Sequence, residues 1–318
     1  MIVCVAGNPS VDKLFEVEEL VHGEIHRPDA FLSLPGGKGI HVAQVATVLG
    51  AEALATGILA GHTGRWIADT LAAEGVPAEF VWGDGETRSS LSVADRATGR
   101  LTEFYEDGIP PRPEEWSELV RIVEGLMGRA SWLALAGSPP AVDGEGESYS
   151  SLIAAAHRAG VPVAVDSRGA ALAQALESAP ELMKINVHEA EELLGRAVEG
   201  IEQAQTAAVE IRSRIGGEGH ACVITLGERG MVLVDPAGDA WHGAVAVRGS
   251  YPVGSGDAFL AGLLTALSRG DSWSQAAALA LGAAAANAEA PGAARLEPER
   301  ARALAGRAEI RTLSEVPS

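Results

Sequence analysis

Short apolar runs alternate with amphipathic stretches along most of the chain. Runs typical of buried strands occur at Ile2–Ala6, Ala53–Leu59, Trp132–Ala136, Val161–Asp166, Leu182–Asn186 and Ala221–Thr225. Helical patterns lie between or after them, near His41–Leu49, Trp66–Glu74, Glu114–Met127, Tyr149–Arg158, Glu189–Leu194 and Gln203–Ile215. This alternation predicts an α/β fold, with a central mostly parallel sheet flanked by helices on both faces. Ligands are then expected at the carboxyl ends of the strands.

Two segments depart from this pattern. One covers about residues 11–35 and alternates apolar with polar residues, and the other, within about 86–107, has the pattern of a hairpin with its turn at Asp95–Gly99. Together they predict a small antiparallel β lid that projects from a single domain spanning residues 1–318. Beyond Thr225, the pattern predicts a strand pair at Gly230–Val234 and Ala240–Val247, and then a mostly helical region from Asp257 to Leu304.

Composition and charge limit the classes of function. Apolar residues make up 47% of the 318 residues, enough for a packed core, and the net charge of −19 argues against nucleic acid and anionic membranes as partners. Cys4 and Cys222 lie in predicted buried strands, so we expect reduced thiols. We find no signal-peptide pattern and expect a cytoplasmic protein.

The run Gly254-Ser255-Gly256-Asp257 places glycines and an acid before an apolar helix. Backbone N–H groups at such a helix start can hold an anion, and the helix dipole adds to the attraction. Asp257 is then the candidate base that takes a proton from an attacking hydroxyl in phosphoryl transfer. The alternative is an ordinary capped helix start.

A second glycine turn, with Gly36, Gly37 and Lys38, also precedes an apolar helix. It is not a Walker A loop, because the required glycine spacing and the Ser or Thr after the lysine are absent. Adjacent glycines would let a sugar approach the backbone, and Lys38 could neutralise an anionic group. The alternative is a turn with a solvated lysine.

Three motifs in this order resemble the PfkB sugar-kinase family of the ribokinase superfamily. Asn8-Pro9-Ser10-Val11-Asp12 is similar to the opening motif of the family, Gly36-Gly37-Lys38-Gly39 to its first signature and Val253–Asp257 to its second. The lysine in the first signature favours the phosphosugar kinases of the family. The resemblance implies a ribokinase-like fold, with Gly254, Ser255 and Gly256 stabilising the transferred phosphoryl group.

The resemblance also assigns residues to the sugar. Asp12 would hold sugar hydroxyls, and Arg88 would reach the sugar phosphate from the lid. The remaining substrate candidates by position are Gly36, Gly37, Lys38, His41, Ser90, Ser138 and Arg27. For Arg88 and Arg27, a solvated surface charge is the alternative.

For the nucleotide, Lys184–Glu189 is similar to a family segment that contacts ATP. Lys184 and Asn186 would touch the phosphates, and Glu189 would order water around Mg²⁺. The other nucleotide candidates are Thr225, Gly227, Gly230 and Asn287, the last near adenine. Asp166–Gly169 resembles a further family segment at a strand end, and it could equally just end a strand.

Three positions depart from the family pattern. His41 and Ser90 stand where asparagine is usual, and Ile185 replaces a proline. Because imidazole is bulkier than a carboxamide and can titrate, the identity of the sugar stays open.

We therefore expect an ATP- and Mg²⁺-dependent kinase that phosphorylates a hydroxyl of a ketohexose phosphate, such as fructose 6-phosphate, tagatose 6-phosphate or fructose 1-phosphate. One alternative is a kinase for an unphosphorylated sugar or nucleoside, and another is a catalytically silent sugar- or nucleotide-binding regulator. An apolar lid face predicts a homodimer through the lid.

Overall fold

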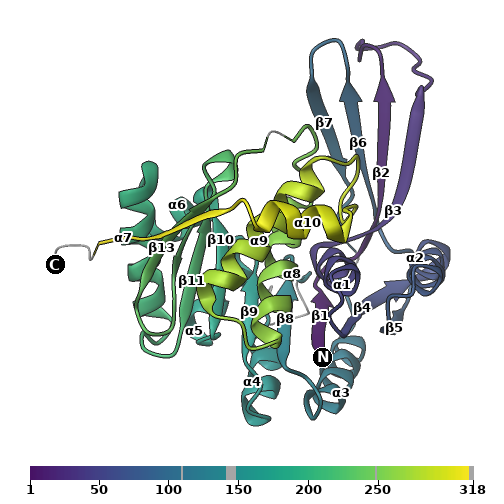
Figure 1. Ribbon diagram of the computed structural model, residues 1–318. Helices are drawn as coiled ribbons and strands as arrows, with labels where there is room; N and C mark the ends of the chain where they lie inside the picture. Colours follow the sequence, from purple (N-terminus) through teal and green to yellow (C-terminus); the bar gives the residue numbers. More distant parts are fainter. Residues whose placement is uncertain (109, 141–147, 248, 315–318) are drawn as a thin grey trace.

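A ten-stranded sheet forms the centre of the molecule (Figure 1). The computed structural model describes residues 1–108, 110–140, 148–247 and 249–314. The parallel part follows the order β5 (Ala78–Gly83), β4 (Ala53–Ala60), β1 (Ile2–Ala6), β8 (Trp132–Ala136), β9 (Val163–Asp166), β10 (Leu182–Asn186) and β11 (Ala221–Thr225). The sheet then continues antiparallel through β12 (Met231–Val234), β13 (Ala240–Ala244) and β14 (Glu309–Thr312).

Helices cover both faces of this sheet. One face carries α1 (Lys38–Val48), α2 (Gly61–Ala73), α8 (Ser255–Ser268), α9 (Trp273–Ala288) and α10 (Pro298–Ala305). The other carries α3 (Pro113–Met127), α4 (Ser150–Arg158), α5 (Gly169–Glu177), α6 (Val187–Leu194) and α7 (Gly200–Arg214). Within β1, Ile2 and Cys4 enter the first core and Val3 and Val5 the second, because successive strand residues point to opposite faces.

The predicted α/β fold is confirmed, and every apolar run assigned to a strand forms one. The pattern did not indicate β5, α5 or β14. β5 and β14 are the edge strands of the sheet and are partly exposed, so their sequences lack the continuous apolar run of a buried strand.

A second sheet projects from the carboxyl ends of the parallel strands (Figure 1). This small sheet has the order β3 (Ala30–Gly36), β2 (Ser10–Val17), β6 (Ser89–Asp95) and β7 (Arg100–Tyr105). Its outer pairs are antiparallel as predicted, whereas the central pair, β2 with β6, is parallel. Both strands leave the main sheet in the same direction, which makes the small sheet mixed.

The pairing register sorts the side chains of the small sheet onto two faces. Asp12 pairs with Ser90 and therefore shares a face with it. Phe15 pairs with Phe31, and this aromatic pair belongs to the opposite face. The predicted sugar residues Asp12 and Ser90 thus lie on one face of the small sheet. Among the described residues, no helix combines the length and the hydropathy needed to cross a membrane.

Candidate active site

The N-terminus of α8 carries the glycine motif. Gly254 is the N-cap in a left-handed conformation with φ 78°, and a Cβ there would lie 2.6 Å from Cβ of Ala293. The left-handed backbone and the lack of space for a Cβ both require glycine at residue 254. Among the described residues, the N–H groups of Gly256 and Asp257 have no protein acceptor, so they are available to an anion.

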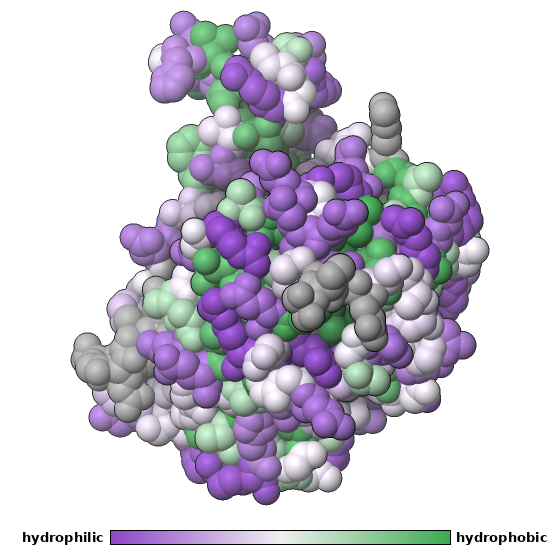
Figure 2. Space-filling model, turned by 90° about the vertical axis from the view of Figure 1, so that its left-hand side faces the viewer, coloured by the Kyte–Doolittle hydropathy of each residue, from purple (hydrophilic) through white to green (hydrophobic). Residues whose placement is uncertain are grey.

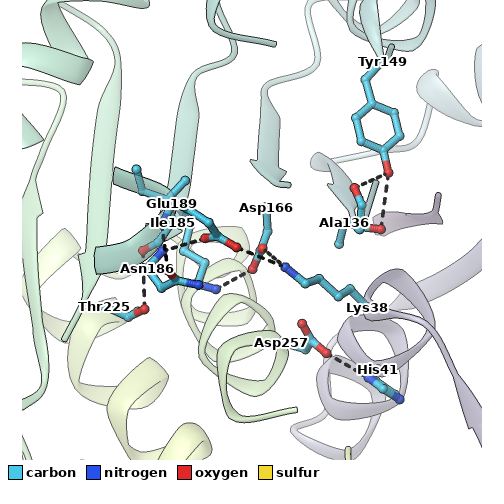
Figure 3. Close-up of polar contacts among 12 residues, drawn as sticks. Lys38, His41, Ala136, Tyr149, Asp166, Ile185, Asn186, Glu189, Thr225 and Asp257 are labelled. Carbon is cyan, nitrogen blue, oxygen red and sulfur yellow. Dashed lines mark hydrogen bonds and ion pairs between the residues drawn. The ribbon is translucent and has the colours of Figure 1, made fainter. Parts of the chain in front are cut away.

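A buried histidine joins Asp257 to Asp12 (Figure 3 shows the Asp257 contact). His41 Nδ1 lies 2.8 Å from Oδ2 of Asp257, and Nε2 lies 3.4 Å from Oδ2 of Asp12. His41 comes from α1, Asp12 from β2 and Asp257 from α8, so the tertiary fold alone brings them together. Ser10 Oγ donates to Oδ1 of Asp12 over 2.6 Å and holds that carboxylate on its other side.

The two carboxylates decide the charge of the imidazole. Burial disfavours the charged ring, but the attraction of the Asp12 and Asp257 carboxylates dominates and raises the pKa of His41 to about 10. Burial would raise the pKa of Asp12, yet the contacts with His41 hold it below its ordinary value. His41 is therefore an imidazolium at neutral pH.

A second charged group lies beside the first (Figure 3). Asp166, at the end of β9, is fully buried and accepts from Lys38 Nζ at 2.7 Å and from Lys184 Nζ at 2.5 Å. Despite its burial, the two ammonium groups lower the pKa of Asp166. Burial would lower the pKa of Lys38, but the surrounding carboxylates, Asp166 first, raise it. A Cβ at residue 256 would meet Lys184 Nζ at 2.9 Å, so this lysine lies over the glycine loop.

Lys38 points toward Asp166 and away from the small sheet. Its Nζ also lies 3.8 Å from Oε1 of Glu189, on the side predicted for ATP. The contacts of Lys38 are therefore with residues outside the predicted sugar set, and its expected role toward a sugar phosphate stays a prediction.

Asn186 and Glu189 form a reciprocal cap at the start of α6. The Glu189 N–H donates to Oδ1 of Asn186 over 3.0 Å, and the Asn186 N–H donates to Oε2 of Glu189 over 2.8 Å. Burial and the nearby Asp166 carboxylate raise the pKa of Glu189. Oε2 of Glu189 accepts in this cap, and the other oxygen, Oε1, faces Lys38.

The predicted nucleotide turn follows β11. Thr225 Oγ1 donates to the carbonyl of Ile185 over 3.4 Å, and Gly227 opens a short 3₁₀ turn. Gly230 ends it at φ 87°, where a Cβ would lie 1.9 Å from a backbone oxygen of β13. A groove of about 390 Å³ beside this turn is lined by Glu228, Val245, Ala246 and Val247.

Asn287 supports the loop before α8. Its side chain is fully buried in α9 and donates to the carbonyl of Val253 over 2.8 Å and to Oγ of Ser255 over 3.3 Å. Its expected place near adenine stays a prediction.

The remaining sugar candidates lie where β1, β6 and β8 meet. Arg88 donates from Nε to Oδ1 of Asn8 at 3.0 Å and from Nη1 to Oγ of Ser90 at 3.3 Å. A Cβ at Gly36 would overlap the Asp12 carboxyl, at 2.2 Å. The Ser138 hydroxyl is buried and has no hydrogen-bond partner among the described residues.

Two glycine positions show how closely α1 approaches its neighbours. Gly37 caps the helix at φ 104°, and a Cβ on Gly39 would lie 2.3 Å from the carbonyl oxygen of Val5. This close packing brings Lys38 and His41 over the end of β1.

Arg27 is not brought to this cluster. It is exposed in the connection between β2 and β3, at the far end of the small sheet from Asp12 (Figure 1). Each strand residue advances the chain by about 3.3 Å, so the length of β2 separates Arg27 from the site.

Two residues stand out beside the candidates that the sequence assigned to a substrate. Asp166 unites the two motif lysines, and the resemblance of Asp166–Gly169 to a family segment had indicated it without giving it a role. Tyr149 is fully buried, and its hydroxyl donates to the Gly137 carbonyl over 2.8 Å, next to Ser138. No motif indicated Tyr149.

The residues present suit a hydrated Mg²⁺ held mainly by phosphates. Among the described residues, no group of three or more acidic, histidine or cysteine side chains could form a protein cage for a metal. Mg²⁺ commonly keeps several waters and needs only one or two carboxylates. Glu189 is the predicted residue of this kind, whereas both oxygens of the buried Asp166 are bonded to lysine ammonium groups.

Taken together, the fold and the site define a phosphotransferase with an alcohol group as acceptor. The model of the pfkB family of carbohydrate kinases matches residues 3–300, and the chain belongs to this family. A 1-phosphofructokinase of Rhodobacter capsulatus is 31% identical over 99% of both chains, and one of Haloferax volcanii is 34% identical over 85% of both.

A solved structure has the same architecture. Phosphofructokinase-2 from Escherichia coli, in complex with substrates and products, superposes with a TM-score of 0.88 at 28% identity and covers 96% of this chain and 98% of its own. The ribokinase-like fold that the motifs implied is therefore confirmed. The protein is a phosphosugar kinase, and kinases of this type use ATP.

Proposed function

We propose that this protein transfers the γ-phosphoryl group of ATP to a hydroxyl of a ketohexose phosphate. The observation that carries the proposal is the position of Asp257, at the start of α8, where N–H groups have no acceptor among the described residues, and beside the His41–Asp12 pair. Fructose 1-phosphate, fructose 6-phosphate and tagatose 6-phosphate are the candidate acceptors, and the named relatives favour the two fructose phosphates.

In the proposed mechanism, Asp257 accepts the proton of the acceptor hydroxyl as its oxygen forms a bond to the γ-phosphorus. The bond from that phosphorus to the bridging oxygen of ADP breaks in the same transfer. The N–H groups of Gly256 and Asp257 and the ammonium of Lys184 stabilise the charge on the moving group. Asp12 orients the sugar by accepting from its hydroxyls.

The cations divide between the two substrates. Arg88 is the candidate for the phosphate of the sugar, since it lies at the base of the small sheet beside Ser90. Lys38 faces Asp166 and Glu189, so we assign it to the phosphoryl group in transit. Mg²⁺, when bound with ATP, would be held by phosphate oxygens and by water that Glu189 orders, and it would neutralise phosphate charge.

Asp257→Asn tests the role of the base. We expect kcat to fall by about 10²–10⁴ while ATP binding, measured by calorimetry, is retained. The acceptor class is tested by rates on the three ketohexose phosphates and on fructose. Turnover of fructose at the rate of its phosphates would overturn the acceptor class, and unimpaired turnover by Asp257→Asn would overturn the mechanism.

The small sheet, formed by about residues 11–35 and 86–107 of a single kinase domain, is proposed as the lid and the dimer contact. Phe31 is 70% exposed and Phe104 59%, and pairing through Phe15 and Leu91 places them on the face opposite Asp12. Apolar side chains appear among hydrophilic ones on this projecting part (Figure 2). Sedimentation should show a dimer in which Phe104→Glu weakens association, and a monomeric parent protein would contradict it.

A further inference from the structure

His41 occupies a position that the proposed mechanism does not use. Its ring lies between the base and the sugar-binding carboxylate, with Nδ1 2.8 Å from Asp257 and Nε2 3.4 Å from Asp12. Only 6% of the side chain is exposed. A buried ring with a carboxylate at each nitrogen needs an explanation beyond packing.

The ring can satisfy both carboxylates only when it carries both protons. A neutral imidazole has one nitrogen lone pair, and here that lone pair would face a carboxylate oxygen. The imidazolium instead donates toward each side. The raised pKa of His41, about 10, agrees with this geometry.

No other cation bonds to either carboxylate among the described residues. Lys38, on the same helix, bonds to Asp166, and Arg88, on the adjoining end of the small sheet, bonds to Asn8. Both contribute charge at longer range, Lys38 near Asp257 and Arg88 near Asp12. His41 is therefore the local counterion of both acids.

His41 forms a bridge between Asp257 and Asp12, and its two contacts differ. The contact with Asp257 has the distance of a good hydrogen bond, whereas the Nε2 contact with Asp12 is an ion pair without hydrogen-bond alignment. Asp12 is also the more exposed of the two acids, at 27% against 8%. Asp12 can consequently turn toward a sugar while Asp257 stays held.

We propose that His41 is a positioning residue whose imidazolium holds Oδ2 of Asp257, leaves Oδ1 for the acceptor hydroxyl, and keeps Asp12 ionised for sugar binding. This inference rests on the proposed roles of Asp257 and Asp12. It makes two separable claims. The orientation claim is that Nδ1 of His41 orients the Asp257 carboxylate, and the charge claim is that the positive charge of the ring keeps Asp12 ionised.

Two amide substitutions separate these claims. The side-chain nitrogen of His41→Asn can take the place of Nδ1, and that of His41→Gln the place of Nε2. The asparagine variant keeps a donor to Asp257, so we expect its kcat to stay within about tenfold of the parent, while the glutamine variant loses a further tenfold or more. Equal kcat values in the two variants would overturn the orientation claim.

The charge claim predicts a change in the pH profile. Both substitutions remove the cation beside Asp12 and so raise the pKa of its carboxyl. The acid limb of the pH profile of kcat/KM for the phosphosugar should therefore move up by about one pH unit. Ionisations of the substrates are common to all variants and cancel in this comparison. His62→Asn is the matched control, because His62 forms an exposed pair with Glu86 at 3.0 Å. An unmoved limb in both His41 variants would overturn the charge claim.

The protonation of His41 can be observed without turnover. In NMR titrations of the full chain, the imidazole signal missing from His41→Asn should remain that of an imidazolium to pH 9, and Asp257→Asn or Asp12→Asn should lower its pKa by at least one unit. A ring that is neutral at pH 7 overturns the bridge. If Asp257→Asn retains turnover while His41 is charged, the proposed function fails and the bridge stands.

Discussion

Replacing Asp166 with asparagine tests the buried charge at the centre of the site. The carboxylate is fully buried and has ammonium groups at 2.7 and 2.5 Å. Asparagine keeps the shape but removes the charge, and Lys184, only 4% exposed, then has no carboxylate within ion-pair distance among the described residues. Breaking a buried pair in this way costs about 3–5 kcal/mol, whereas an exposed pair contributes about 0–1 kcal/mol.

The assay is urea denaturation at pH 7 without nucleotide. Asp166→Asn should lose about 3–5 kcal/mol, and Glu124→Gln, which breaks the exposed pair with Arg158, should lose less than about 1 kcal/mol. Adding Lys184→Met to Asp166→Asn removes the stranded cation and should recover part of the loss. A loss below about 1 kcal/mol for Asp166→Asn would refute the argument.

The pH dependence gives a second check on Asp166. Its pKa is lowered in the folded protein, so its contribution is present above the unfolded pKa of about 4 and is lost as the pH falls through the folded value. The difference in stability between the parent protein and Asp166→Asn should therefore narrow below about pH 4. A constant difference across that range would contradict the assigned charge state.

Further measurements probe the packing around the site. Gly39→Ala forces a Cβ to 2.3 Å from a backbone oxygen of β1 and should cost about 1–3 kcal/mol in denaturation, whereas Gly128→Ala, with open space around it, should not. Tyr149→Phe leaves the partly buried carbonyl of Gly137 without its 2.8 Å donor and should cost about 1–3 kcal/mol; an unchanged midpoint would contradict this. His41 has a raised pKa, so the stability of the parent relative to His41→Asn should fall as the pH rises from 6.5 to about 10, and a rise would refute the bridge.

The hydrophobic periodicity of the chain was sufficient to predict the parallel sheet except its edge strand β5, and its helices except α5. Buried strands and amphipathic helices carry their environment in their own sequence, so apolar runs found β1, β8, β10 and β11 with their observed bounds. The edge strands were missed because exposure removes that signal. The parallel pairing of β2 with β6 depends on where each strand leaves the main sheet, which no local pattern records.

The functional residues also divide into those that the sequence indicated and those whose contacts only the tertiary structure decided. Gly254 and Asp257 belong to one helix start, and together with the motifs at residues 8–12 and 36–39, in this order, they predicted the type of reaction from the sequence alone. The partners of Lys38, His41 and Asn287 come from strands and helices far away in the chain, and only the tertiary structure decided them. Because charge and burial act through space, the folded site turned Lys38 toward Asp166 and made His41 the counterion of two acids.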